Sequence, residues 1–129
     1  NSYLEKNGYP KTIKELNKHS FITYGRGAPS PVFNPDWALK LGVQDGKKRK
    51  SVMKVNSVYG LLLAVQSGVG LAALPDYITY NVPSITKVLP EESGKPTETH
   101  FVYPESMKSL ARVKAFRNFI FSKVSEWKF

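Results

Sequence analysis

The sequence lacks cysteine altogether and has no long apolar run among its 129 residues. Without thiols there is no disulfide framework, thiolate metal site or cysteine nucleophile. The longest apolar run, residues 61–65, is far shorter than the roughly 20 residues that a membrane-spanning helix needs. No secretory leader, with its basic start and apolar core, is visible. We therefore expect a cytoplasmic protein with no membrane partner.

Acidic residues are also scarce, with 10 Asp and Glu against 19 Lys and Arg, for a net charge of +9. This balance attracts polyanions, so a basic nucleic-acid-binding module is one possible function. The basic residues are spread along the chain, however, with one cluster at residues 47–50. That cluster follows Asp45-Gly46, which is typical of a hairpin turn because both residues tolerate positive φ. We interpret it as a solvated hairpin tip rather than a DNA contact.

Signatures of catalysis and metal binding are missing too. Neither His19 nor His100 has the neighbours that a metal site or a general base needs. At His19, which ends a predicted helix, an imidazolium would interact favourably with the helix dipole. The glycine pairs at residues 25–27 and 68–70 lack the strand-to-helix context of a dinucleotide fingerprint. We expect no catalytic residue, no metal and no cofactor.

What the sequence does contain is short helical and strand patterns in alternation. Short helices are predicted at residues 2–7, after Thr12 and from Pro75. Predicted strands cover residues 21–24, 71–74, 85–89 and 99–103, with hairpin arms at 37–43 and 51–55 and a loop at 25–35. This order predicts the α/β class with a mixed sheet.

The most informative segment covers residues 55–75, which read as strand, capped helix, glycine stop and second strand. Asn56 or Ser57 can accept a hydrogen bond from a first-turn amide, and Gly68 can end the helix. A helix that starts at a strand end presents free N–H groups and a positive dipole to an anionic or carbonyl-bearing ligand. An ordinary strand-helix-strand crossover without a ligand is the alternative.

The last segment, residues 109–127, is the clearest helix in the sequence. Its apolar residues recur at three- and four-residue steps. They are Leu110, Val113, Phe116, Ile120, Val124 and Trp127. We expect this stripe to pack on a sheet rather than to lie on a membrane.

Several motifs occur in an order typical of one family. They are GYP at 8–10, ELNKH at 15–19, FITY at 21–24, VNS at 55–57, AVQSGVGLAALPDY at 64–77, VLP at 88–90, FVYP at 101–104 and RVKAFRNFI at 112–120. In this order the chain resembles the C-terminal part of the effector-binding (substrate-binding) domain of LysR-type transcriptional regulators. The resemblance covers nearly the whole chain.

The resemblance implies a type 2 periplasmic-binding-protein-like fold with an effector in a cleft between two subdomains. Residues 1–97 would form the second subdomain. Residues 98–129 would be the return strand and C-terminal helix of a first subdomain that is mostly absent. The parent protein would bind DNA only through an N-terminal domain that this chain does not contain. A solute-binding protein of the same fold is an alternative.

The resemblance also implies positions for the effector, a small molecule for which a carboxylate would suit the helix start. Carried over by position, the effector-binding residues are Tyr24, Gly25, Val55, Asn56, Ser57, Phe101 and Val102. Asn56 and Ser57 could donate hydrogen bonds to it or serve only as caps. If the last helix has lost the subdomain on which it packs, its stripe is exposed and drives homo-oligomerisation, unless it docks on the chain's own sheet.

Overall fold

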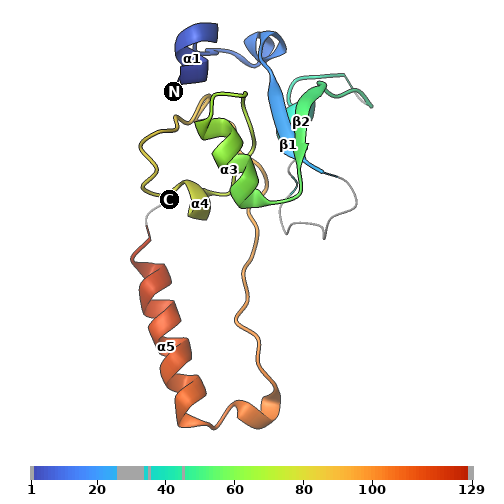
Figure 1. Cartoon of the computed structure of the whole chain (residues 1–129). Coiled ribbons are helices and arrows are strands. Elements are labelled where there is room, and N and C mark those ends of the chain that lie inside the picture. Colours follow the sequence, from blue (N-terminus) through green and yellow to red (C-terminus); the bar gives the residue numbers. More distant parts are fainter. Residues whose placement is uncertain (1, 26–33, 35, 45, 128–129) are drawn as a thin grey trace. The chain divides into compact units, whose positions relative to one another are not determined.

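The computed structural model describes residues 2–25, 34, 36–44 and 46–127. The chain divides into two compact units, Asn1–Pro96 and Thr97–Phe129. The elements of the first are α1 (Ser2–Asn7), the 3-10 helix η1 (Ile13–Lys18), β1 (Phe21–Tyr24), α2 (Trp37–Lys40), β2 (Ser51–Val55), α3 (Val58–Gln66) and α4 (Asp76–Thr79) (Figure 1). The second contains η2 (Glu105–Met107) and α5 (Ala111–Ser125).

The sheet of the first unit is small and parallel. β1 pairs with β2 so that Tyr24 lies opposite Val55. On the other edge of β1, Ile22 N–H donates to the Leu71 carbonyl at 2.8 Å and Leu71 N–H donates to the Ser20 carbonyl at 2.9 Å. The expected strand at residues 71–74 is therefore reduced to a single parallel bridge between Phe21 and Leu71.

The predicted hairpin is wrong. Residues 37–40 form the helix α2, and β2 pairs in parallel with β1 rather than with residues 37–43. Arg49 explains the preference, because its Nη1 donates to the carbonyls of Ala38 at 3.3 Å and Leu41 at 2.6 Å. A helix this short cannot pair those carbonyls internally. Of the expected turn, Gly46 has φ +78°, whereas Asp45 lies outside the described residues.

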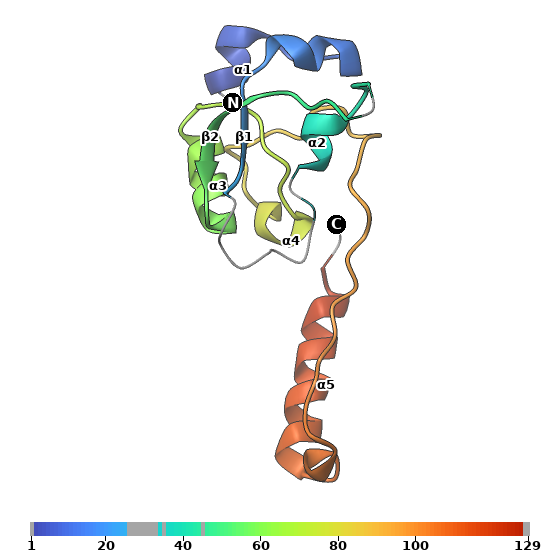
Figure 2. The ribbon, with the colours of Figure 1, turned by 90° about the vertical axis from the view of Figure 1, so that its right-hand side faces the viewer.

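Helices cover both faces of β1 (Figure 2). Phe21 and Ile22 are neighbours in the strand, so their side chains point to opposite faces. Ile22 is buried with Leu61 and Ala64 of α3, whereas Phe21 is buried with Leu16 of η1 and Leu39 of α2. Two small apolar clusters thus hold the first unit together, one on each side of the strand.

The predicted helix at the end of residues 55–57 is confirmed as α3. Ser57 is its N-cap, and its Oγ accepts a hydrogen bond from Gly60 N–H at 3.3 Å. Gly68 follows the helix with φ +74°, a left-handed conformation that glycine adopts without a Cβ clash. The helices expected at residues 2–7, after Thr12 and after Pro75 are likewise present, the second of them as a 3-10 helix.

Two other expected strands do not form. Residues 85–89 and 99–103 lie outside the named strands and form no ladder with another described segment. In the second unit, the Phe101 ring instead contacts the Phe116 ring of α5, with 5.8 Å between the ring centroids. The predicted last helix is confirmed as α5. None of its residues is buried, so the second unit by itself does not cover its apolar stripe, and the packing of this stripe on a sheet stays a prediction. No described helix is long and apolar enough to cross a membrane.

Candidate functional site

The carboxyl ends of β1 and β2 bring three of the predicted effector residues together. Tyr24 and Val55 are register partners, and Gly25 N–H donates to the Val55 carbonyl at 2.7 Å. Tyr24 and Val55 are half-buried and pack against the cluster of Ile22, Leu61 and Ala64. Their positions are therefore fixed by the sheet register and by contact with α3.

Asn56 and Ser57 connect β2 to α3 directly beyond these strand ends. The Ser57 hydroxyl caps the helix, and the Asn56 side chain is exposed to solvent. The positive end of a nine-residue helix thus lies at the carboxyl ends of two parallel strands. Open α/β sheets bind ligands outside the carboxyl ends of their strands, and a helix start favours an anion there.

A cavity of about 290 Å³ lies beside Tyr24. Polar and basic residues contribute most of its lining, and they include Thr23, Asp36, Lys48, Lys50, Ser51 and Lys54. The sequence interpretation missed this cavity, because it forms where α2 and the segment before β2 fold back against β1. The basic residues that were assigned to a hairpin tip therefore border the sheet.

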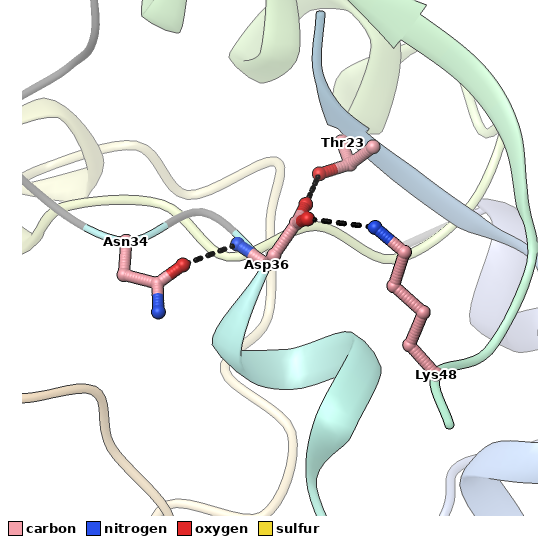
Figure 3. A network of polar contacts seen from close by, with 4 residues as sticks. All are labelled: Thr23, Asn34, Asp36 and Lys48. Atoms are coloured by element: carbon pink, nitrogen blue, oxygen red, sulfur yellow. Dashed lines mark hydrogen bonds and ion pairs between the residues drawn. The ribbon is translucent and has the colours of Figure 1, made fainter. Parts of the chain in front are cut away.

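Asp36 is held by a network of polar contacts (Figure 3). Its carboxylate accepts hydrogen bonds from the Thr23 hydroxyl at 2.8 Å and from Lys48 Nζ at 2.9 Å. Its N–H donates to the Asn34 side-chain oxygen at 3.1 Å. Partial burial raises the pKa of Asp36, but the hydrogen bonds from Lys48 and Thr23 outweigh it and hold the pKa below its ordinary value. Asp36 is thus an anion paired with Lys48.

The other two lysines of the cavity contribute to its excess charge. In the described part of the chain, neither Lys50 nor Lys54 forms an ion pair. Once the charge of Lys48 is balanced by Asp36, the positive charges of Arg49, Lys50 and Lys54 remain among the residues that line the cavity with Tyr24. This charge favours a small anion, as the start of α3 does at the strand ends.

Arg49 also borders the cavity, but its guanidinium is engaged in structural contacts. Nε donates to the Asn17 side chain at 2.8 Å and Nη2 donates to the Ile13 carbonyl at 3.2 Å, in addition to the two α2 carbonyls. The guanidinium carbon lies 5.9 Å from the centroid of the Phe21 ring. The expectation of a solvated tip is therefore wrong for Arg49. No local signal could have shown this, since Asn17 and Ile13 are 32 and 36 residues away.

Phe101 and Val102 belong to the second unit, whereas the other five predicted residues belong to the first. Phe101 is half-buried beside Phe116, and Val102 is 83% exposed. Their role toward an effector stays a prediction.

The two histidines have different surroundings. His19 follows η1 with its ring centroid 5.8 Å from that of Tyr3, and its Nδ1 is buried with no hydrogen-bond partner among the described residues. Burial lowers the pKa of His19, which overturns the expectation of a favourable imidazolium there. His100 Nε2 lies 3.6 Å from a Glu98 carboxylate oxygen, and both side chains are exposed. Within the described ranges, no group of three His, Asp or Glu side chains could hold a metal ion.

Comparison with known proteins assigns the chain. The sequence profile of the LysR substrate binding domain matches residues 1–124. The chain belongs to this family. The LysR substrate-binding domain implies a periplasmic-binding-protein-like fold, and helices around a parallel sheet are consistent with that α/β class.

A curated relative agrees with this assignment. An uncharacterized HTH-type transcriptional regulator of Haemophilus influenzae is 31% identical over 107 residues, which cover 80% of this chain and 36% of the relative. The chain thus spans about a third of the length of that relative. No solved structure matches the chain. The family is thus that of a substrate-binding domain, and the relative that shares it is named as a transcriptional regulator.

Proposed function

We propose that this LysR substrate-binding domain senses a small anionic effector, and that binding controls the activity of a parent regulator that contacts DNA through an N-terminal domain. One observation carries the proposal. The carboxyl ends of β1 and β2 lie at the start of α3, and Tyr24 at the end of β1 also lines the cavity that contains Lys50 and Lys54. A carboxylate would gain from both the helix N-terminus and the lysines.

In this proposal the five residues from Tyr24 to Ser57 form one wall of the effector site. Residues 1–97 serve as the second subdomain of the periplasmic-binding-protein-like fold. Residues 98–129 belong to the first, and Phe101 and Val102 would line the strand that crosses back to it. The apolar bodies of Tyr24 and Phe101 would then contact the hydrocarbon part of the effector while its carboxylate faces the helix start.

Calorimetric titration with acetate, benzoate, succinate and citrate tests this proposal. At least one of these carboxylates should bind, and Ser57→Asp should abolish its binding. Aspartate is as good an N-cap as serine, so the helix stays capped while the new charge repels the ligand. Lys54→Gln should weaken the same binding, because it removes one of the uncompensated positive charges of the cavity.

Ser93→Asp provides the matched control, since it adds the same charge in an exposed loop. The affinity of Ser93→Asp for the carboxylate should equal that of the wild type. The proposal fails if none of the four carboxylates binds. It also fails if Ser57→Asp binds them as tightly as Ser93→Asp does.

A further inference from the structure

A second cavity lies in the first unit, and its chemistry is the opposite of that near Tyr24. Its volume is about 280 Å³, and most of its lining is apolar. The side chains that define it include Leu16, Phe21, Trp37, Leu71, Val82 and Leu89. None of the predicted effector residues lines it. It is therefore a separate site and does not depend on the function proposed above.

The backbone conformation at Leu89 and at Gly94 fixes two parts of the cavity wall. Leu89 has φ +49°, a left-handed conformation that is strained for a side chain other than glycine, and it packs against the cluster of Leu16, Phe21 and Leu39. A Cβ added to Gly94 would lie 2.9 Å from Trp37 Nε1, so the backbone there lies directly against the indole. The chain thus places a strained leucine and a tightly confined indole around unfilled space.

The lining determines which kind of molecule fits. An engineered apolar cavity of about 150 Å³ binds benzene. The cavity described here is larger, and its charged lining residues are Asp76, Lys87 and Glu92, two acidic and one basic. An additional carboxylate is disfavoured by that balance, in contrast to the region of Lys50 and Lys54.

We propose that this cavity binds an uncharged aromatic molecule of one or two rings, as a second ligand of the chain. The ring stacks against or packs edge-on to Trp37, and the leucines contact its other apolar surface. The anionic effector and the aromatic ligand then occupy different sites on the first unit.

Trp37 offers a direct test, because the chain has two tryptophans and only Trp37 lines the cavity. Toluene and naphthalene are titrated against the ¹⁵N-labelled chain, and the two indole N–H resonances are followed after assignment with Trp127→Phe. The Trp37 resonance should shift and saturate while that of Trp127 stays in place. Benzoate, the charged counterpart of toluene, should not cause this shift.

Variants that change the volume of the cavity complete the test. Ala38→Phe places a ring in the cavity and should weaken toluene binding by about tenfold or more, whereas Ala111→Phe, at an exposed position of α5, should leave it unchanged. If Ala38→Phe does not fold, Leu89→Ala enlarges the cavity and should shift the preference from toluene toward naphthalene.

Two results would overturn the proposal. One is an equal, non-saturating shift of both indole resonances, and the other is toluene binding that neither Ala38→Phe nor Leu89→Ala alters. Ser57→Asp should still bind toluene, so failure at this cavity is distinguishable from failure at the effector site.

Discussion

At the scale of single residues, Arg49 organises the first unit. Its guanidinium joins η1, through Asn17 and Ile13, to the carbonyls at the end of α2. Lysine cannot reproduce this fork of donors, because its ammonium is a single point charge. The four acceptors therefore explain why residue 49 is an arginine, whereas its neighbours in the basic cluster are lysines.

We predict that Arg49→Lys lowers the free energy of unfolding by about 1.5–3 kcal/mol, the range for losing hydrogen bonds to a charged group. Urea denaturation measures this difference. Lys50→Gln, at an exposed neighbouring position, should change stability by less than about 0.5 kcal/mol. Equal stability of Arg49→Lys and the wild type would show that the guanidinium contacts contribute nothing.

His19 is the second residue with a measurable consequence. Burial lowers its pKa in the folded chain from the ordinary value of 6.5. The unfolded chain therefore takes up a proton more readily, so the contribution of neutral His19 is complete above pH 6.5 and is lost as the pH falls through the lower folded pKa. We predict that His19→Gln reduces the loss of stability between pH 7 and 5.

Thermal unfolding at a series of pH values follows this effect. The control is His100→Gln, which replaces an exposed histidine and should leave the pH dependence of the wild type unchanged. A pH profile of His19→Gln that coincides with that of the wild type would contradict the assignment.

At the scale of elements, two glycines near α3 should respond in opposite ways to alanine. Gly60 lies inside α3, where an added Cβ meets only ordinary contacts, the nearest at 3.5 Å. Gly70 lies beside β1, where an added Cβ would be 2.5 Å from the Ser20 carbonyl oxygen. That oxygen accepts the hydrogen bond from Leu71 N–H, so the clash falls on the single bridge that joins residues 70–74 to the sheet.

We predict that Gly60→Ala raises the free energy of unfolding by about 0.5–1 kcal/mol, because alanine is the better helix former. Gly70→Ala should lower it by about 1–3 kcal/mol through steric overlap. The two variants serve as controls for each other in chemical denaturation. Stabilisation by both would mean that residue 70 does not lie against Ser20.

Elements with local signals could be predicted from the sequence, whereas those with distant partners could not. The start and end of α3 follow from Ser57 and Gly68, and the strand character of residues 21–24 follows from their composition. The apolar alternation at residues 37–43 fits a hairpin arm. The helix α2 that forms there instead depends on Arg49, Leu16 and Phe21, which are remote from it in sequence.

The candidate site shows the same limit. The family resemblance predicted Tyr24, Gly25 and Val55 as effector-binding residues, and the parallel register brings them together. The lysines beside them could not be placed, because their position depends on how α2 folds back on β1. Asp36 was missed for that reason, although its pairing with Lys48 and Thr23 determines which charges remain available.

At the scale of the whole molecule, α5 presents a large apolar surface. Phe116, Phe119 and Phe121 are each more than half exposed, and no residue of the helix is buried. Exposed apolar surface of this kind promotes association. We propose that a second copy of the chain covers it, so that the chain is a homo-oligomer.

Sedimentation equilibrium over a range of concentrations tests this proposal. The apparent mass should rise above that of the 14.5 kDa chain, and Phe119→Lys should reverse the rise. Val52→Lys is the control, because it changes an exposed apolar residue of β2 in the other unit. A wild-type monomer at all concentrations, or equal association of the two variants, would contradict it.

The central claim is that an anionic effector binds at the ends of the parallel strands. The most direct measurement locates the bound carboxylate by amide chemical shifts in ¹⁵N-labelled chain, with the ligand that binds most tightly in the calorimetric panel. We predict saturable shifts of the Gly25, Asn56, Ser57 and Val58 amides, and their loss in Ser57→Asp. Shifts confined to other parts of the chain, or saturable shifts that persist unchanged in Ser57→Asp, would contradict the claim.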